Sequence, residues 1–309
     1  MSILLIFENK NVAPWKSHLI EKLPSTTIEV YPNVKDTKEV DFVICWKPKK
    51  KVFEQFPNIK IIQSVGASID HITNSQTIYK DSIITRIVDE KLSIDMWEFL
   101  ITIVLSELKN MRAYAAQKSD KNWQQHHYRS IHNTTISILG LGSIGGYVAE
   151  KFAQIGFNVK GWSTSNKEIL KVKSYCGENE FDAFLDNSDF LINLLPLTDD
   201  TKDILNKSVF QKLPKNAFLI NVGRGEHLVD KDLIDSLNTS MLSGAFLDVF
   251  REEPLPKEHA FWSHSKIQIT PHVASLTNVK RATEQIIENY RRFLNNEELL
   301  NIVSLEKGY

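Results

Sequence analysis

Hydrophobic residues in the first ninety positions gather into short runs rich in isoleucine and valine. Five of these runs predict strands, at residues 3–7, 27–30, 42–46, 59–64 and 83–88. The intervening segments, such as residues 14–23, carry charged residues and apolar positions at helical spacing. Strands that alternate with helices are typical of parallel βαβ units. This part of the chain therefore predicts a parallel sheet covered by helices.

A long apolar-rich segment at residues 95–111 follows, and it predicts a helix buried on most sides, with Ser93 as a candidate N-cap. Residues 117–133 are polar and aromatic without a clear period, which predicts a loop that enters a second domain. The alternation then restarts, with candidate strands at residues 135–139, 157–162, 190–195, 217–222, 245–249 and 267–270 and a last helix at 278–294. Two successive α/β blocks predict two doubly wound parallel-sheet domains with a cleft between them.

Composition and charge narrow the function classes. The 309 residues suit two domains, and a hydrophobic fraction of 42% with 24% charged residues excludes a disordered or coiled-coil chain. The 37 Lys and Arg residues balance 38 Asp and Glu residues, which disfavours a broad nucleic-acid-binding or polybasic membrane-binding surface.

The sequence shows no membrane-spanning segment or signal peptide and few cysteines. The apolar runs are shorter than the roughly 20 residues that span a bilayer, and the N-terminal run has no basic segment before it. Two cysteines, Cys45 and Cys176, are too few for a disulfide framework or a tetrahedral metal cluster. We therefore expect a cytoplasmic protein with no metal site, no nucleic-acid partner and no membrane contact.

A glycine-rich segment gives the first sign of chemistry. The predicted strand at 135–139 runs into Gly140, Gly142 and Gly145 in the G-x-G-x-x-G spacing, with Ser143 and Ile144 inside it, and a helix follows. In this context the first glycine permits a tight turn, the second lets the backbone approach a pyrophosphate, and the third lets helix and strand pack closely. The helix N-terminus supplies free N–H groups for the phosphates. We expect a dinucleotide-binding site here.

The end of the next strand discriminates between NAD and NADP. An NAD site usually carries Asp or Glu about 20 residues after the glycines, to bind the ribose 2′-hydroxyl. Here Ser163 and Thr164 follow the strand, with Lys167 nearby and no carboxylate. Hydroxyls and a lysine suit a 2′-phosphate, so NADP is favoured and NAD is the alternative.

Three polar segments after later strands predict a catalytic set. Arg224 lies between two glycines, Glu253 lies in an acidic segment, and His272 directly follows a strand and a proline. Ligands of open α/β sheets bind at the carboxyl ends of strands. An arginine fork suits a carboxylate, and a histidine oriented by a glutamate suits proton donation to a carbonyl. Together these residues predict reduction of a 2-oxo acid.

The same motifs carry a resemblance. The chain resembles the D-isomer-specific 2-hydroxyacid dehydrogenase family, and within it the glyoxylate/hydroxypyruvate reductase A branch. The matching segments are residues 65–72, 140–145, 194–198, 221–225, 247–250, 253–256, 270–272 and 306–309. Two positions depart from the pattern: Thr164 stands where the branch has an arginine, and Ser68 replaces a glycine of the substrate loop. If position 68 needs a positive φ, serine is costly there.

This resemblance implies a fold and a site. It implies a Rossmann cofactor domain at residues 98–284, inserted in a flavodoxin-like substrate domain formed by residues 1–97 and 285–309, and a homodimer. It implies Arg224, Glu253 and His272 as the catalytic residues. It also implies further contacts, which comprise Val65, Gly66 and Ala67 for the substrate carboxylate, Trp46 as a wall of a small pocket, Leu195 and Pro196 for the cofactor, and Asp248 near the nicotinamide.

We therefore expect an NAD(P)H-dependent reductase that converts glyoxylate to glycolate and hydroxypyruvate to D-glycerate. Two alternatives remain open from the sequence. One is a dehydrogenase for a larger 2-oxo acid, which differs only in pocket size. The other is a non-catalytic nucleotide-sensing protein, because fold alone does not determine function.

Overall fold

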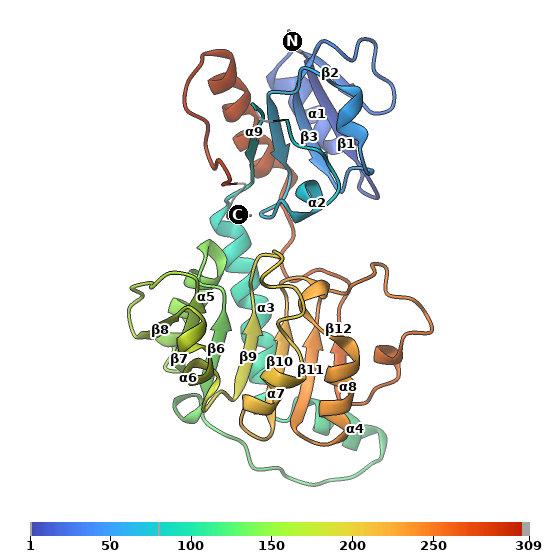
Figure 1. Ribbon diagram of the computed structural model, residues 1–309. Coiled ribbons are helices and arrows are strands. Elements are labelled where there is room, and N and C mark those ends of the chain that lie inside the picture. The colour runs from blue at the N-terminus through green and yellow to red at the C-terminus, as the bar shows by residue number, and fades with distance from the viewer. Residues whose placement is uncertain (1, 80, 305–309) are drawn as a thin grey trace. The chain divides into compact units, whose positions relative to one another are not determined.

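The computed structural model describes residues 2–79 and 81–304 (Figure 1). The matching C-terminal segment 306–309 lies outside the described residues. Internal contacts divide the chain into two units, one formed by residues up to Asp89 together with those from Thr277 on, and the other by Glu90–Leu276. These boundaries fall eight residues before each predicted domain boundary, at 97 and 284. Helix α3 (Glu90–Leu108) belongs to the second unit from its first residue, and helix α9 (Val279–Leu294) belongs wholly to the first unit. The functional assignment of the two domains stays a prediction.

The first unit contains a five-stranded parallel sheet in the order β2-β1-β3-β4-β5 (Figure 1). Its strands are β1 (Ser2–Phe7), β2 (Thr27–Val30), β3 (Val40–Trp46), β4 (Ile61–Ser64) and β5 (Ile83–Thr85). Its α-helices are α1 (Ala13–Lys22), the single-turn α2 (Asp70–Thr73) and α9 (Val279–Leu294). This order is that of a flavodoxin-like sheet, in which the strand order reverses between β1 and β3.

The second unit contains a seven-stranded parallel sheet in the order β12-β11-β10-β9-β6-β7-β8 (Figure 1). Its strands are β6 (Thr135–Leu139), β7 (Asn158–Ser163), β8 (Val172–Cys176), β9 (Phe190–Asn193), β10 (Ala217–Asn221), β11 (Leu242–Leu247) and β12 (Ile267–Ile269). Its α-helices are α3, α4 (Met111–Ser119), α5 (Ser143–Gln154), α6 (Phe181–Leu185), α7 (Lys207–Lys212) and α8 (Asp230–Asn238). The first six strands in chain order reproduce the doubly wound dinucleotide-binding order, so the predicted α/β fold class is confirmed.

Burial explains why these segments form central strands. All residues of β9 and β10 are buried, as expected for parallel strands covered by helices on both faces. The second unit's core extends from this sheet to α3 and α5 through residues such as Leu100, Val104 and Val148. Among the described residues, no helix is both long and apolar enough to cross a membrane.

Three local predictions were wrong. β8 was missed because it is an edge strand in which Tyr175 is the only buried residue, so its apolar signal is weak. Ser93 is not an N-cap, because α3 begins at Glu90 and Ser93 is buried within it. The predicted loop at 117–133 begins inside α4, which ends at Ser119.

Candidate active site

The carboxyl edge of the second unit's sheet gathers polar side chains from neighbouring strands. Asn193 ends β9 and Asn221 ends β10, and the two residues lie opposite each other in register. Asp248 directly follows β11 and is 1% exposed. Buried polar side chains need hydrogen-bond partners, and here they find them in the loops that carry the predicted catalytic residues.

His272 and Glu253 contact each other directly. Nδ1 of His272 lies 3.0 Å from both carboxylate oxygens of Glu253, and the two side chains are 34% and 21% exposed. Oε1 of Glu253 also accepts a hydrogen bond from the Phe250 N–H at 3.2 Å, which holds the carboxylate in place. A carboxylate at Nδ1 keeps a proton on that nitrogen and leaves Nε2 as the nitrogen that exchanges a proton with a ligand.

Asp248 organises the loop that presents His272. Its Oδ1 accepts hydrogen bonds from Thr270 Oγ1 at 2.5 Å and from the Val273 N–H at 2.8 Å, and its Oδ2 accepts from the Ala274 N–H at 2.9 Å. The His272 N–H donates to the Asp248 carbonyl at 2.9 Å. This loop-holding role was not predicted, whereas the predicted nicotinamide contact of Asp248 stays a prediction.

The backbone of His272 adopts a left-handed conformation, with φ of 55°. A non-glycine residue in this region costs of order 1–3 kcal/mol and persists only where its surroundings impose it. The hydrogen bonds that Asp248 accepts from this loop supply that constraint. The strained position of a histidine at a sheet edge, next to its carboxylate partner, is typical of a functional side chain.

Arg224 is held by a buried histidine that the sequence did not single out. The Arg224 N–H donates to Nδ1 of His227 at 3.1 Å, and His227 is fully buried. Nδ2 of Asn193 lies 2.8 Å from the same nitrogen, and Nε2 of His227 lies 3.2 Å from the Pro196 carbonyl. His227 therefore ties the Arg224 loop to the segment that contains the predicted cofactor contacts Leu195 and Pro196.

The two asparagines complete this buried network. Asn193 Nδ2 donates to Asn221 Oδ1 at 2.9 Å, and Asn221 Nδ2 donates to the Arg224 carbonyl at 3.0 Å. The available sequence signal was a pair of asparagines at the ends of two otherwise apolar strands. That pattern identifies a polar strand edge, but it does not show that His227 contacts Asn193 there.

The loop of Arg224 also packs against the loop of Glu253. A Cβ added to Gly225 would lie 1.9 Å from the Phe250 carbonyl carbon, which only a glycine allows. Since the Phe250 N–H binds Glu253, this close approach couples the two loops mechanically. Arg224, Glu253 and His272 thus share one sheet edge, and the side chains of Glu253 and His272 contact each other directly.

The glycine-rich loop fits a dinucleotide. Gly140 has φ of 97°, as a tight turn requires, and a Cβ at Gly145 would lie 1.8 Å from the Gly140 carbonyl oxygen. A Cβ at Gly142 would meet nothing within 4 Å, so the backbone is open where a pyrophosphate is expected. Gly142 is followed directly by the first turn of α5, which contains Ser143 and Ile144 and whose N–H groups have no intrahelical partner.

The three residues predicted to recognise a 2′-phosphate differ in their exposure to solvent. Ser163 is 8% exposed, and its hydroxyl donates to the Ser165 carbonyl at 2.8 Å. A phosphate only accepts hydrogen bonds. The Ser163 hydroxyl already donates its one proton to Ser165 and has none left to donate to a phosphate. Thr164 and Lys167 are exposed beyond the end of β7 and are better placed to contact a phosphate.

The remaining predicted residues form their own group in the first unit. Val65, Gly66 and Ala67 follow β4, and a Cβ added to Gly66 would lie 2.8 Å from Cζ3 of Trp46, so the indole packs directly against this loop. Arg86 braces the loop by donating to the Ala67 carbonyl at 3.2 Å. The expected strain at Ser68 is absent, because Ser68 does not adopt a positive φ.

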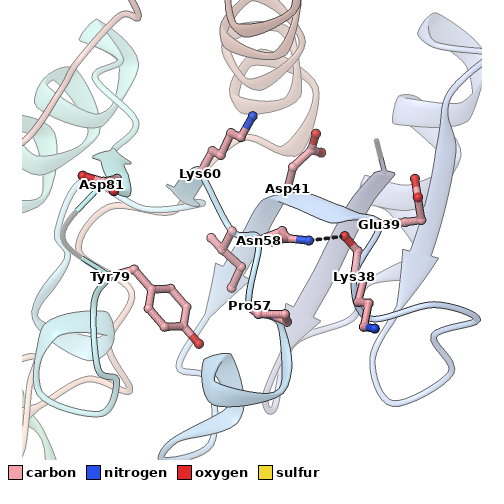
Figure 2. Close-up of a pocket in the computed structure, with 9 residues that line it drawn as sticks. Lys38, Glu39, Asp41, Pro57, Asn58, Lys60, Tyr79 and Asp81 are labelled. Carbon is pink, nitrogen blue, oxygen red and sulfur yellow. Dashed lines mark hydrogen bonds between the residues drawn. The ribbon is translucent and has the colours of Figure 1, made fainter.

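A separate hollow of about 660 Å³ lies at the amino end of β3, lined by residues that include Asp41, Lys60, Tyr79 and Asp81 (Figure 2). Trp46 ends the same strand, so the hollow lies at the opposite edge of the sheet from the substrate loop. Oδ1 of Asp41 is buried and has no hydrogen-bond partner among the described residues. Burial raises the pKa of Asp41, and Lys60 opposes this shift. The hollow contains none of the predicted catalytic residues.

These features define a dinucleotide-binding α/β protein with a histidine–glutamate pair at the ligand edge of its sheet. The model of the D-isomer specific 2-hydroxyacid dehydrogenase NAD-binding domain matches residues 101–274, which is more than half of the chain. The chain therefore belongs to the D-isomer specific 2-hydroxyacid dehydrogenase family.

Individual relatives agree with this assignment over the full chain. The glyoxylate/hydroxypyruvate reductase A of Yersinia enterocolitica is 34% identical over 100% of both sequences. The NADPH-dependent glyoxylate/hydroxypyruvate reductase of Sinorhizobium meliloti, solved with NADP and sulfate, aligns with a TM-score of 0.93 and 31% identity over 100% of both chains. A family member from Xanthobacter autotrophicus Py2, solved with NADPH and MES, has a TM-score of 0.93 and 30% identity, and the alignment covers 100% of this chain and 99% of the other.

Proposed function

We propose that this protein is an NADPH-preferring reductase of small 2-oxo acids, with glyoxylate and hydroxypyruvate as its first substrates. The observation that carries the proposal is the contact between His272 Nδ1 and Glu253, at the same sheet edge as Arg224 and on the same sheet as the glycine-rich loop. The relatives named for this activity cover the whole chain. A nucleotide-sensing protein would need no such histidine–glutamate pair.

The proposed chemistry assigns one role to each residue of the set. Arg224 binds the substrate carboxylate through its planar guanidinium and polarises the ketone. The protonated ring of His272 donates a proton from Nε2 to the carbonyl oxygen, while Glu253 holds Nδ1–H and stabilises the imidazolium. The nicotinamide, when bound, supplies the hydride. The product is a 2-hydroxy acid, and His272 regains its proton from solvent.

Residues of the first unit are proposed to bind the substrate carboxylate and to limit the size of the substrate side chain. The main chain of Val65, Gly66 and Ala67 binds the C1 carboxylate, and Trp46 limits the room beside it. Because the Trp46 ring already contacts Gly66, a small side chain on the substrate fits this proposal best.

NADP is proposed over NAD as the nucleotide. No carboxylate stands at the end of β7 to bind a free ribose 2′-hydroxyl, and Thr164 and Lys167 are exposed there. Two structural neighbours hold NADPH or NADP. The backbone of Gly142 and the N-terminus of α5 would hold the pyrophosphate, and Leu195, Pro196 and Asp248 would line the nicotinamide end.

Two further properties are part of the proposal. The protein works as a homodimer in the cytoplasm, without nucleic-acid or membrane partners. The nearly neutral balance of 37 basic and 38 acidic residues supports the proposal that the protein has no nucleic-acid or membrane partner.

Steady-state rates test the proposal. Purified protein is assayed with glyoxylate, hydroxypyruvate and pyruvate, each with NADPH and with NADH. We expect turnover of the first two acids and a kcat/KM at least tenfold higher with NADPH. A preference for NADH would overturn the cofactor assignment, and no turnover of either acid would overturn the substrate assignment.

A further inference from the structure

An arginine at the carboxyl edge of the first unit's sheet has no part in the reaction as proposed so far. Arg86 directly follows β5, and the loop of residues 65–67 directly follows β4. These two strands pair in parallel, with Gln63 opposite Thr85, so the loop and Arg86 leave the sheet side by side. Arg86 therefore lies at the edge where doubly wound proteins bind ligands, next to the loop proposed to hold the substrate carboxylate.

The guanidinium of Arg86 is half-buried and has no acidic partner among the residues that the structure describes. Its Nη1 donates to the Ala67 carbonyl at 3.2 Å, which uses one of five N–H donors. Burial lowers the pKa of Arg86, but an arginine stays protonated at neutral pH. A partly desolvated cation with unused donors favours an anion as its ligand.

The carbonyl groups of the loop are held by the protein. The Gly66 carbonyl accepts a hydrogen bond from the Ile87 N–H at 2.9 Å. The Ala67 carbonyl accepts the one from Arg86. Because these two acceptors already have donors, the loop can present its N–H side to an anion.

The N–H groups of the loop differ in what they can still bind. The Val65 N–H donates to the Cys45 carbonyl at 3.3 Å. The Gly66 N–H donates to Oγ of Ser64 at 3.2 Å. The Ala67 N–H has no acceptor within the described part of the chain, and Ala67 is only half-buried. A carboxylate has two oxygens that accept hydrogen bonds, so it calls for a strong donor besides this N–H.

Arg86 is close enough to be that donor. Its Nη1 lies 3.2 Å from the carbonyl oxygen of Ala67, the same residue whose N–H lacks an acceptor. Since the nitrogen and the carbonyl oxygen of one residue are at most about 3.7 Å apart, Nη1 lies within about 7 Å of the Ala67 nitrogen. A carboxylate that accepts one hydrogen bond of about 2.9 Å at each oxygen can bridge donors at this separation.

We propose that Arg86 is a second arginine of the substrate site, which binds the C1 carboxylate of the 2-oxo acid together with the Ala67 N–H. This inference rests on the proposed function and adds a binding residue to it. Arg224 keeps its proposed role at the carboxylate and the ketone. The reaction itself is unchanged, because Arg86 binds the substrate and transfers no proton.

Steady-state kinetics with glyoxylate and NADPH test the proposal. Arg86→Gln removes the charge and should raise KM about tenfold or more, while kcat changes less than threefold. Arg86→Lys keeps the charge and should have a KM clearly below that of Arg86→Gln. The Kd for NADPH should stay within about twofold in both variants, because the glycine-rich loop is untouched. A KM of Arg86→Gln close to the wild-type value, or equal KM values in the two variants, would contradict the proposal.

Arg291→Gln serves as the matched control, because it removes the same charge from an exposed position in the last turn of α9, in the same unit. Its KM should equal that of the wild type. An equal rise of KM in Arg86→Gln and Arg291→Gln would assign the effect to long-range electrostatics. A fall of kcat in Arg86→Gln without a rise of KM would mean that Arg86 only supports the loop. Either result contradicts the proposal.

A binding measurement separates this proposal from the proposed function. Oxamate carries the carboxylate of a 2-oxo acid but has an amide in place of the reducible carbonyl. With NADPH present, oxamate should raise the melting temperature of the wild type and of Arg291→Gln, but not that of Arg86→Gln. An equal shift in all three proteins, or no shift in the wild type, would contradict carboxylate binding by Arg86.

The two proposals can fail separately. If glyoxylate is reduced and Arg86→Gln has wild-type kinetic constants, the Arg86 proposal fails and the proposed function stands. If oxamate stabilises the protein through Arg86 but no 2-oxo acid is reduced, the proposed function fails and Arg86 remains a carboxylate-binding residue.

Discussion

The main-chain N–H of Arg224 points at Nδ1 of His227, 3.1 Å away. A backbone N–H is always a donor, so this ring nitrogen carries no proton. The other ring nitrogen, Nε2, lies 3.2 Å from the Pro196 carbonyl, which only accepts. His227 is therefore a neutral imidazole with its proton on Nε2, and it fixes the main chain of the arginine that is proposed to bind substrate.

Replacing His227 by phenylalanine should disturb Arg224 without removing it. Asn193, the Arg224 N–H and the Pro196 carbonyl would each lose one hydrogen bond, although Asn193 keeps its bond to Asn221 and the Pro196 carbonyl keeps its bond from Thr201. A buried donor left unsatisfied costs about 1–3 kcal/mol of stability. We expect KM for glyoxylate to rise several-fold more than kcat falls. His227→Asn, whose Oδ1 can accept in place of Nδ1, should restore part of the KM. Equal kinetic constants in His227→Phe and in the surface variant His127→Phe would rule out a positioning role.

His272→Gln removes the proposed proton donor and keeps a polar side chain of similar size. General acid catalysis contributes typically 10²–10⁴-fold, so kcat should fall by a factor in that range. The Kd for NADPH, measured by fluorescence titration, should stay within about twofold, because the glycine-rich loop is untouched. A variant that keeps its kcat would end the assignment of His272 as the acid.

Arg224→Lys tests the carboxylate-binding role. An ammonium keeps the charge but cannot form the two parallel hydrogen bonds of a guanidinium with a carboxylate. We expect KM for glyoxylate to rise by about tenfold or more. If KM stays near the wild-type value, the substrate carboxylate is bound by other groups.

Asp41 gives a prediction about stability rather than activity. Because burial raises its pKa in the folded protein, folding favours the protonated carboxyl. Its contribution to stability is therefore present at low pH and is lost as the pH rises through the raised pKa. Asp41→Asn should be more stable than wild type at pH 7, by about 1 kcal/mol in urea unfolding. The difference should vanish once the wild-type carboxyl is protonated.

Asp81→Asn is the control for this prediction. Asp81 lines the same hollow but is exposed (Figure 2). Its substitution should leave the free energy of unfolding unchanged within about 0.5 kcal/mol at either pH. A stabilisation of the same size in both variants would show that net charge, not burial of Asp41, is responsible.

The sequence predicted most of the fold because its signals are local. Buried central strands such as β9 and β10 are continuous apolar runs, and the glycine spacing from Gly140 to Gly145 has one physical interpretation when a strand precedes it and a helix follows. β8 escaped prediction because an edge strand is only half-buried and does not need an apolar run.

The candidate site was predictable only in part, for a related reason. Arg224, Glu253 and His272 lie in the loops that follow β10, β11 and β12, so their position along the chain places them at the sheet edge. His227 is held through a contact with Asn193, which is distant in sequence. Such contacts depend on tertiary packing and leave no spacing pattern in the chain.

The most direct test of the central claim is to follow the hydride. NADPH that carries deuterium at both C4 positions of the nicotinamide is incubated with the protein and glyoxylate, and the glycolate is analysed by mass spectrometry. The account predicts that one deuterium is found on C2 of glycolate for each NADPH oxidised. The transfer should become strongly slower in His272→Gln. Binding of NADPH with no label transferred to glycolate would contradict the assignment of this protein as a 2-oxo acid reductase.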